Sequence, residues 1–314
     1  MIQPAFDTSL LHPRYWLSWS GVALIELLGR LPWPVLWALG GIIGRLAYFI
    51  VPQRRAVARC NLVCCFPHLS RMRREWLLWT HFGWLGVAAL SQGVSWGISR
   101  PRLQRLIHFQ QQEIVAAQLA AARPLIFLVP HFLAVDLGGA GLAAFIHPSA
   151  YMYQEPRNPV FAWRVRRARC QFGSVAIERQ DPLRSLIRLL KRGTPLFYLP
   201  DQDAGRRGIW VPFCGQPAAT VPMLGRFAAL TDAVVIPTIM RFAAWGRGVE
   251  VIFQPPLSEF PSGEPVADTA QMNQVIEDAL PPHAAQYFWV HRRFKTRPPG
   301  APALYPPRVR RQRR

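Results

Sequence analysis

Lysine is almost absent from this chain of 314 residues, in which only Lys191 and Lys295 are found. Arginine therefore carries nearly all of the positive charge: 37 basic residues stand against 17 acidic ones, and the formal net charge is +20. A guanidinium group binds phosphate and carboxylate through two parallel hydrogen bonds. This charge balance indicates polyanionic partners, namely nucleic acid, an anionic membrane surface or a phosphorylated substrate.

Cysteine is scarce as well, and its pattern excludes two common uses. The number is odd and no pair has C-x-x-C spacing, so neither a disulfide framework nor a zinc site is predicted. Reduced thiols in a domain that faces the cytoplasm are expected. The glycine-rich stretch 138–141 lacks G-x-G-x-x-G spacing; its small residues allow close packing or the approach of a bulky substrate. We expect no cofactor and no metal. The cysteines are Cys60, Cys64, Cys65, Cys170 and Cys214.

The chain also lacks a clean membrane-spanning run. Hydrophobic residues make up 51% and the mean hydropathy is +0.09, which is high for a soluble protein but too low for a polytopic one. The most apolar part, 15–51, is rich in tryptophan and is interrupted by charges and prolines, whereas crossing needs about 20 apolar residues. It could cross once, as 15–35 or 31–51, or lie in the interface as amphipathic helices. The interrupting residues are Glu26, Arg30, Pro32, Pro34 and Arg45.

The flanks of this run predict its orientation. No signal-peptide cleavage pattern follows it. Arg54, Arg55 and Arg59 come directly after it, and basic residues next to a membrane segment favour the cytoplasmic side. We therefore expect the bulk of the chain to lie in the cytoplasm.

Three parts are expected along the chain: an N-terminal membrane anchor (1–55), a catalytic domain (56–296) and a basic, proline-rich, disordered tail (297–314). Residues 71–90 and 103–121 have helical patterns. From residue 123 strands alternate with helices, which predicts an α/β fold with a mixed, largely parallel sheet flanked by helices. The expected strands are 125–129, 149–153, 194–199, 233–240 and 249–254. The expected helices are 133–145, 157–169, 182–192, 219–230 and 268–280.

The most informative residues are His131 and Asp136. The apolar run 125–129 ends at Pro130 and predicts a buried strand, and the small and apolar residues after His131 predict the start of a helix. Residues five apart on one continuous helix diverge, so the two side chains meet only if His131 lies in the turn before the helix. An imidazole whose tautomer is fixed by a carboxylate, at the open end of a sheet, is suited to act as a general base.

The stretch Gly93-Val94-Ser95-Trp96-Gly97 matches the nucleophile elbow G-x-S-x-G. Such an elbow needs a strand before the serine and a helix after it. The residues before Ser95 have a helical pattern instead, and Pro101 follows closely. A membrane-associated serine hydrolase, with Asp201 and His291 completing a triad, is therefore kept as an alternative.

Charged residues also follow two further predicted strands. Asp201 and Asp203 close the strand at 194–199, where they form either a turn or part of a site. Metal binding by these two acids has no other support. Five arginines between 157 and 169 follow the strand at 149–153. Ligands of open α/β sheets bind beyond the carboxyl ends of the strands, so at least one arginine is expected to reach a phosphate or carboxylate there.

Six segments together resemble the lipid A late acyltransferases, the lauroyl and myristoyl transferases of Gram-negative envelope synthesis, within the lysophospholipid acyltransferase superfamily. The likeness runs in order over roughly residues 10–305. The pattern His-x4-Asp marks the superfamily, and Val-Pro-Phe…Ala-Ala-Thr and Trp-Val-His-Arg-Arg-Phe-Lys narrow it to this branch. Many members carry Glu where this chain has Asp136. The segments are 130–136, 158–161, 177–181, 199–203, 211–220 and 286–295.

The resemblance implies an inner-membrane enzyme whose catalytic domain faces the cytoplasm. It implies transfer of an acyl chain from acyl carrier protein to a hydroxyl of a 3-hydroxyacyl chain on the lipid A precursor. His131 would be the general base and Asp136 its orienting partner, with direct transfer and no acyl-enzyme. Arg169 and Arg179 match positions near the family's site, and Asp201 would order an arginine or a sugar hydroxyl.

Two alternatives to this reading stay open: the serine hydrolase, and an acyltransferase that acts on another lysolipid. A nucleic-acid-binding protein would explain the net charge, but it would explain neither the apolar N-terminal part nor the histidine and acids at strand ends. We therefore expect acyl carrier protein, the lipid A precursor and inner-membrane phospholipid as partners, and no nucleic acid.

Overall fold

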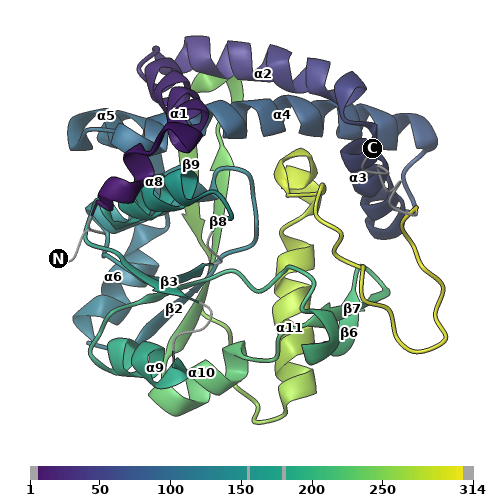
Figure 1. Ribbon diagram of the computed structural model, residues 1–314. Coiled ribbons are helices and arrows are strands. Elements are labelled where there is room, and N and C mark those ends of the chain that lie inside the picture. The colour runs from purple at the N-terminus through teal and green to yellow at the C-terminus, as the bar shows by residue number, and fades with distance from the viewer. Residues whose placement is uncertain (1–5, 154–155, 179–181, 307–314) are drawn as a thin grey trace.

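The computed structural model describes residues 6–153, 156–178 and 182–306, and its centre is a seven-stranded sheet (Figure 1). The strand order is β1-β9-β8-β2-β5-β3-β4, and every neighbouring pair is parallel except β8 and β9. The predicted mixed, largely parallel sheet is confirmed. Its strands are β1 (Ile107–Gln110), β2 (Leu125–Leu128), β3 (Ala150–Tyr153), β4 (Val175–Glu178), β5 (Leu196–Tyr198), β8 (Val234–Phe242) and β9 (Val249–Phe253).

Helices cover both faces of the sheet, and the burial of the central strand β2 reflects this. All four of its residues are buried. Leu125 and Phe127 join one apolar cluster, whereas Ile126 and Leu128 join another. A parallel strand with both faces covered has this continuous apolar character. The helices of the domain are α3 (Pro52–Cys65), α4 (Arg71–Gly97), α5 (Arg100–Leu106), α6 (Gln112–Ala120), α7 (Val135–Phe145), α8 (Pro159–Cys170), α9 (Leu183–Lys191), α10 (Leu224–Thr231) and α11 (Pro265–Asp278).

The prediction of one helix over 103–121 is wrong. The structure has α5, then the strand β1, then α6 in this region. β1 is a four-residue edge strand that pairs only with β9, from Ile107 opposite Val249 to Gln110 opposite Ile252. Its extended conformation depends on a partner far along the chain, so local periodicity does not indicate it. Three other short strands were missed as well: β4, and the antiparallel hairpin of β6 (Ile209–Phe213) and β7 (Gln216–Thr220).

The apolar N-terminal region forms two helices, α1 (Trp16–Gly29) and α2 (Trp33–Ile50). They are separated at the proline-containing segment predicted to interrupt the run, since Pro32 precedes α2 and Pro34 lies in its first turn. Both pack on α4, and α2 lies along α4 at one edge of the molecule (Figure 1). Among the described residues, α2 is the one helix that is long and apolar enough to cross a membrane, judged by length and composition.

The C-terminal segment returns to the N-terminal half of the domain. Tyr305 is buried, donates a hydrogen bond from its hydroxyl to Asn61 at 2.5 Å and accepts one from the Phe294 backbone at 3.0 Å. The Cys60 thiol donates to the Leu304 carbonyl. The expectation of disorder from residue 297 is therefore wrong as far as residue 306; residues 307–314 lie outside the described part.

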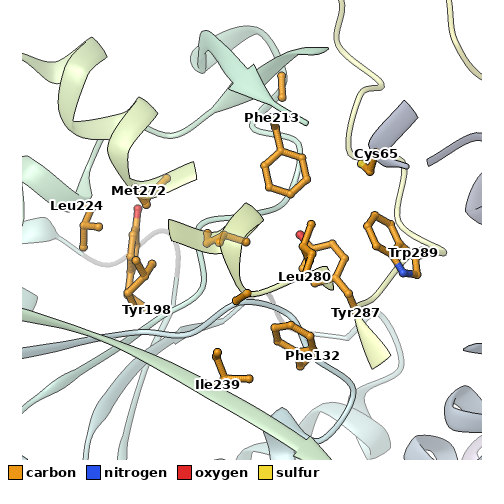
Figure 2. Packing of buried hydrophobic residues seen from close by; sticks show 14 of the residues in the cluster. Cys65, Phe132, Tyr198, Phe213, Leu224, Ile239, Met272, Leu280, Tyr287 and Trp289 are labelled. Atoms are coloured by element: carbon orange, nitrogen blue, oxygen red, sulfur yellow. The ribbon is translucent and has the colours of Figure 1, made fainter. Parts of the chain in front are cut away.

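Aromatic side chains join this C-terminal region to the sheet (Figure 2). Tyr287 packs edge-on against Phe132, with ring centroids 5.6 Å apart, and against Trp289 at 4.8 Å. Phe213, on the β6–β7 hairpin, completes the group at 6.4 Å from Tyr287. Because Phe132 follows His131 directly, this cluster forms the packed support behind the candidate site.

Candidate active site

His131 lies at the carboxyl end of β2, three residues after Leu128. The segment 286–288 pairs with its backbone: the Leu133 amide donates to the Gln286 carbonyl at 2.8 Å, and the Phe288 amide donates to the His131 carbonyl at 3.0 Å. The turn before α7 is thus held by a strand-like contact from a segment some 155 residues away along the chain. This contact fixes the backbone from which the imidazole projects.

The hydrogen-bond partner of His131 is Asp201. The Nδ1 atom lies 2.5 Å from Asp201 Oδ1, and the His131 backbone amide donates to Oδ2 at 2.8 Å. Asp201 follows β5, which is the parallel neighbour of β2, so the two strand ends lie side by side. One carboxylate therefore fixes both the backbone and the ring of His131, and it favours the tautomer whose proton is on Nδ1.

Asp201 is buried, with 2% of its surface exposed. Burial alone would raise the pKa of this carboxyl, but the His131 side chain and the hydrogen bonds from His131 and Tyr287 outweigh it and lower the pKa to about 2. Asp201 is therefore ionised at neutral pH. The expectation that Asp201 orders an arginine or a sugar hydroxyl is corrected: its oxygens are directed at His131 and Tyr287, within the protein.

Asp136 has different partners from the one predicted. Its Oδ1 accepts two hydrogen bonds from Arg169, at 2.9 Å from Nε and 2.7 Å from Nη2, and its Oδ2 accepts one from Gln92 at 2.9 Å. Burial alone would raise the pKa of Asp136, but Arg169 and Gln92 together lower it. The predicted pairing of His131 with Asp136 is thus wrong in its geometry. Asp136 lies on the first turn of α7 and is directed at α4 and α8.

A cavity of about 960 Å³ opens beside His131. Among the described residues the Nε2 atom of His131 has no hydrogen-bond partner, and the side chain is 23% exposed where it borders this cavity. The volume is at the upper end of the range for small-molecule sites. The walls combine apolar residues of α4, α7 and β3 with the Asp136–Arg169 pair, so the cavity can hold a long apolar group near a fixed charge.

The small residues of α7 serve two purposes. A Cβ atom at Gly138 would lie 2.7 Å from Met240 Sδ, so this glycine allows the helix to pack closely on β8. Gly139 instead lines the cavity, where an added Cβ would lie 3.4 Å from the Phe197 ring. The sequence suggested close packing or room for a substrate, and neighbouring glycines provide one each.

Ser95 lacks the surroundings of a nucleophile. It lies near the end of the long helix α4, not in a turn between a strand and a helix, and its hydroxyl donates to the Gln92 carbonyl at 2.9 Å. The triad partners suggested for it are engaged elsewhere: Asp201 holds His131, and Nε2 of His291 accepts a hydrogen bond from the Asp203 amide at 3.1 Å. The described geometry does not assemble a serine triad.

The other predicted site residues are Arg169, Arg179 and Asp203. Arg169 borders the cavity and stacks its guanidinium group 5.6 Å from the centroid of Tyr151. Arg179 lies outside the described residues. Asp203 accepts hydrogen bonds from the backbone and hydroxyl of Thr296, so it does not converge with Asp201 on one point. Within the described ranges no group of three His, Cys, Asp or Glu side chains could hold a metal ion.

The motif at 286–295 has a structural use in this protein. Arg293 is buried and donates to the Ala219 carbonyl at 2.9 Å and to the Thr220 hydroxyl at 2.6 Å, which ties the segment to β7. Burial, and then the nearby His131, lower the pKa of His291 to about 4, so His291 is neutral at physiological pH. Tyr287, whose hydroxyl donates to Asp201, was not among the predicted site residues, although it belongs to a segment that carried the resemblance.

Comparison with known proteins gives a family match over nearly the whole chain. The sequence profile of the bacterial lipid A biosynthesis acyltransferases matches residues 3–296. The chain is 33% identical to a lipid A biosynthesis lauroyltransferase of Escherichia coli, over 96% of this chain and 99% of the relative. It is 32% identical to a palmitoleoyltransferase of the same organism, with the same two shares, and 31% identical to a myristoyltransferase, over 95% and 92%. This chain belongs to the bacterial lipid A biosynthesis acyltransferase family.

Proposed function

We propose that this protein transfers a fatty acyl chain from acyl carrier protein to a hydroxyl of a 3-hydroxyacyl chain on a lipid A precursor. The observation that carries the proposal is the pairing of His131 with a buried, ionised Asp201 at the edge of a large cavity. A secondary alcohol is a poor nucleophile at neutral pH and needs a base in contact with its proton. His131 presents Nε2 for that purpose.

The reaction proceeds by direct attack. The alcohol oxygen attacks the thioester carbonyl while Nε2 of His131 takes the hydroxyl proton. The imidazolium that forms is stabilised by the Asp201 carboxylate, which also keeps the other proton on Nδ1. When the tetrahedral intermediate collapses, the C–S bond breaks and the departing thiolate takes the proton from Nε2. An ester and the free thiol of the carrier are released, and His131 is neutral again.

The Asp136–Arg169 pair acts through position and charge. Arg169 is held by Asp136 and by the face of Tyr151, and both acid and arginine border the cavity. A guanidinium group fixed in this way supplies positive charge beside the reacting groups, where an anionic part of the substrate is held. The cavity walls away from this pair are largely apolar, which suits acyl chains.

The partners follow from charge and from lipid chemistry. The lipid A precursor and the phosphopantetheine arm carry phosphate, and acyl carrier protein is acidic, so all three complement a net charge of +20. We place the protein at the inner membrane with its catalytic domain on the cytoplasmic side, since Arg54, Arg55 and Arg59 follow the apolar N-terminal helices. No cofactor takes part in the proposed chemistry.

The test measures acyl transfer to a lipid A precursor from acyl-loaded carrier protein. His131→Ala is expected to lower kcat by about 10²–10⁴-fold without unfolding the protein. Near-normal transfer by that variant would overturn the assignment of the base. A panel of lysophospholipid acceptors, run beside the lipid A precursor, distinguishes the proposed acceptor from another lysolipid.

Ser95→Ala provides the control for a covalent route. With direct transfer this variant keeps its rate within about threefold, because the Ser95 hydroxyl is bonded to its own helix. Enzyme incubated with radiolabelled acyl donor and no acceptor, then denatured, should carry no label. Label that is present in the parent protein and absent from Ser95→Ala would establish an acyl-enzyme and refute direct transfer.

A further inference from the structure

We propose that α2 lies flat on the membrane surface and does not cross the bilayer, so that the molecule is seated on one leaflet through the outer face of this helix. The inference deepens the proposed function, since the acceptor proposed there is itself a lipid, and it rests on that function only for the choice of a lipid partner. The occupant to which it commits is a leaflet that contains anionic phospholipid.

The inner face of α2 is fixed to the catalytic domain at backbone contact. A Cβ atom at Gly44 would lie 2.0 Å from the Phe82 carbonyl oxygen, and one at Gly86 would lie 2.0 Å from the Gly40 carbonyl oxygen. Further along, the Tyr48 hydroxyl donates to Glu75 at 3.2 Å. From Gly40 to Tyr48 the partners on α4 run backwards along the chain, from Gly86 to Glu75, so α2 packs antiparallel to α4 over this part of its length.

The helix α4 cannot follow α2 into hydrocarbon, because its other side belongs to the active-site domain. Its buried His81 lies 3.0 Å, through Nδ1, from the Ala285 carbonyl, and its Gln92 donates to Asp136. A spanning α2 would therefore have to leave α4 and lose the close glycine contacts. The start of α2 is also anchored, since Arg102 donates to the Leu31 carbonyl at 2.6 Å.

The outer face of α2 is apolar over the whole helix. Buried positions recur along α2 with the helical period, and every exposed side chain between them is apolar except Arg45. We call this set the outer face: Val35, Leu39, Ile42, Ile43, Leu46, Phe49 and Ile50. Both sides of α2 are thus apolar, but only one is covered by protein. Soluble proteins rarely leave seven large apolar side chains exposed to water along one face of a helix.

The charges that interrupt the apolar run do not disturb this face. Glu26, on α1, is paired with Arg164 of α8. Arg164 is buried, with 8% of its surface exposed, and it also donates to the Trp96 carbonyl at 2.6 Å. Arg45 is exposed, but it donates back to the Gly41 carbonyl at 3.2 Å and lies beside α4, where a Cβ atom added at Gly83 would be 3.4 Å from its guanidinium carbon. The charges that argued against a clean span are therefore satisfied within the protein or along the helix itself.

A tryptophan from a distant part of the chain extends the same surface. Trp245 lies in the turn between β8 and β9, is 80% exposed and has a left-handed backbone conformation (φ 58°). The next residue, Gly246, lies against α2: its added Cβ would be 3.3 Å from Pro34 and 3.6 Å from Trp37. Tryptophan favours the interface between headgroups and hydrocarbon. A β-turn packed on α2 could not remain there if α2 crossed the bilayer.

Charge complementarity selects an anionic leaflet. Arg30 is exposed just before α2, and Arg54 is exposed on the first turn of α3, where it also donates to the Val290 carbonyl at 3.2 Å, so each end of the outer face is flanked by a cation. Apolar contact together with flanking basic residues is the combination that holds a helix in the plane of an anionic membrane.

Reporter fusions to the full-length protein test the topology. An alkaline phosphatase that is active only in the periplasm, or a green fluorescent protein that fluoresces only in the cytoplasm, is placed before residue 1 and, separately, after residue 314. If α2 lies flat, both ends report the same compartment. If α2 crosses, the ends report opposite compartments and the proposal is refuted; α1, at roughly 21 Å, is too short to bring the chain back.

Vesicle flotation tests the outer face itself. The full chain with Leu39→Ser, Ile42→Ser and Leu46→Ser is mixed with phosphatidylethanolamine–phosphatidylglycerol vesicles, and its partitioning is expected to fall at least about tenfold. The matched control carries Val175→Ser, Leu230→Ser and Val266→Ser, three exposed apolar residues of β4, α10 and α11, and should float like the parent. Equal flotation of both variants, with unchanged melting temperatures, would overturn the proposal. Neither measurement involves acyl transfer, so failure of the proposed function would not alter these outcomes.

Discussion

Replacing Asp201 with asparagine tests which carboxylate serves His131. The carboxylate accepts two hydrogen bonds from this one residue, from Nδ1 at 2.5 Å and from the backbone amide at 2.8 Å, whereas an asparagine side chain has a single acceptor. If its carbonyl stays on the backbone amide, its NH2 group donates to Nδ1. The remaining ring proton is then on Nε2, and the imidazole cannot accept the substrate proton.

The opposite orientation of the amide is also unfavourable. Its NH2 group would face the His131 backbone amide, and a buried donor without an acceptor costs about 1–3 kcal/mol. We therefore expect kcat to fall by about 10²–10⁴-fold. KM should change little, because Asp201 is buried behind His131 and does not border the main cavity. The Asp201→Asn variant should also be less stable, because an amide lacks the charge that the native site favours. The pKa of Asp201 is about 2, roughly two units below that of an unperturbed carboxyl, which corresponds to a loss of about 2–3 kcal/mol in the free energy of unfolding at neutral pH.

Asp136→Asn is the matched variant for this experiment. It leaves both hydrogen bonds of His131 in place and removes the charge that holds Arg169. Its main effect should be a higher KM for the anionic substrates. The assay is steady-state transfer from acyl-loaded carrier protein, with melting temperatures measured for both variants. If Asp201→Asn retained normal kcat while Asp136→Asn lost a hundredfold in kcat alone, Asp136 would be the orienting acid and the reasoning would fail.

Three further changes give distinct results. Tyr287→Phe removes the hydroxyl that donates to Asp201 but keeps the ring packed on Phe132 and Trp289; kcat should fall about tenfold at constant KM in the transfer assay. Burial holds the pKa of His81 at about 4, below the 6.5 of an unfolded chain, so the unfolded state binds the proton first and stability is lost as pH falls from about 6.5 to about 4. This loss is about 3 kcal/mol, and melting curves of His81→Gln should lack it. Gly86→Ala forces a Cβ to within 2.0 Å of the Gly40 carbonyl oxygen and should lower the melting temperature by several degrees, whereas Gly83→Ala on the same helix meets only the flexible Arg45 side chain and should not.

The hydrogen-bond partner of His131 could not be predicted from the spacing of nearby residues. Asp136 is five residues away and carries the sequence pattern, but it begins α7 and is directed at Gln92 and Arg169. Asp201 is 70 residues away and becomes the partner because β5 lies next to β2 in the sheet. The sequence placed Asp201 at the end of a predicted strand and Asp136 on the first turns of the helix that follows another. It could not rank them, because strand order within a sheet depends on pairing between distant segments.

The buried strands and the helices between them could be predicted, because their signals lie in the local sequence. A strand such as 125–129 is apolar throughout because both of its faces are covered, and that property is visible in the residues themselves. Edge elements such as β1 have no such signature, since half of their environment is solvent. The charges within the apolar N-terminal run were visible too, but not the buried Arg164 that neutralises Glu26 from 138 residues away.

The helix α4 lies between α2 and the cavity. One side receives α2 at backbone contact, and the other carries Leu85, Ala88 and Gln92 on the cavity wall. Packed helix axes lie about 8–10 Å apart, so a leaflet that covers the outer face of α2 would be only two helix layers from the cavity. An acceptor whose acyl chains are anchored in that leaflet would then lie close to the cavity that borders the His131 imidazole, as the direct transfer proposed above requires.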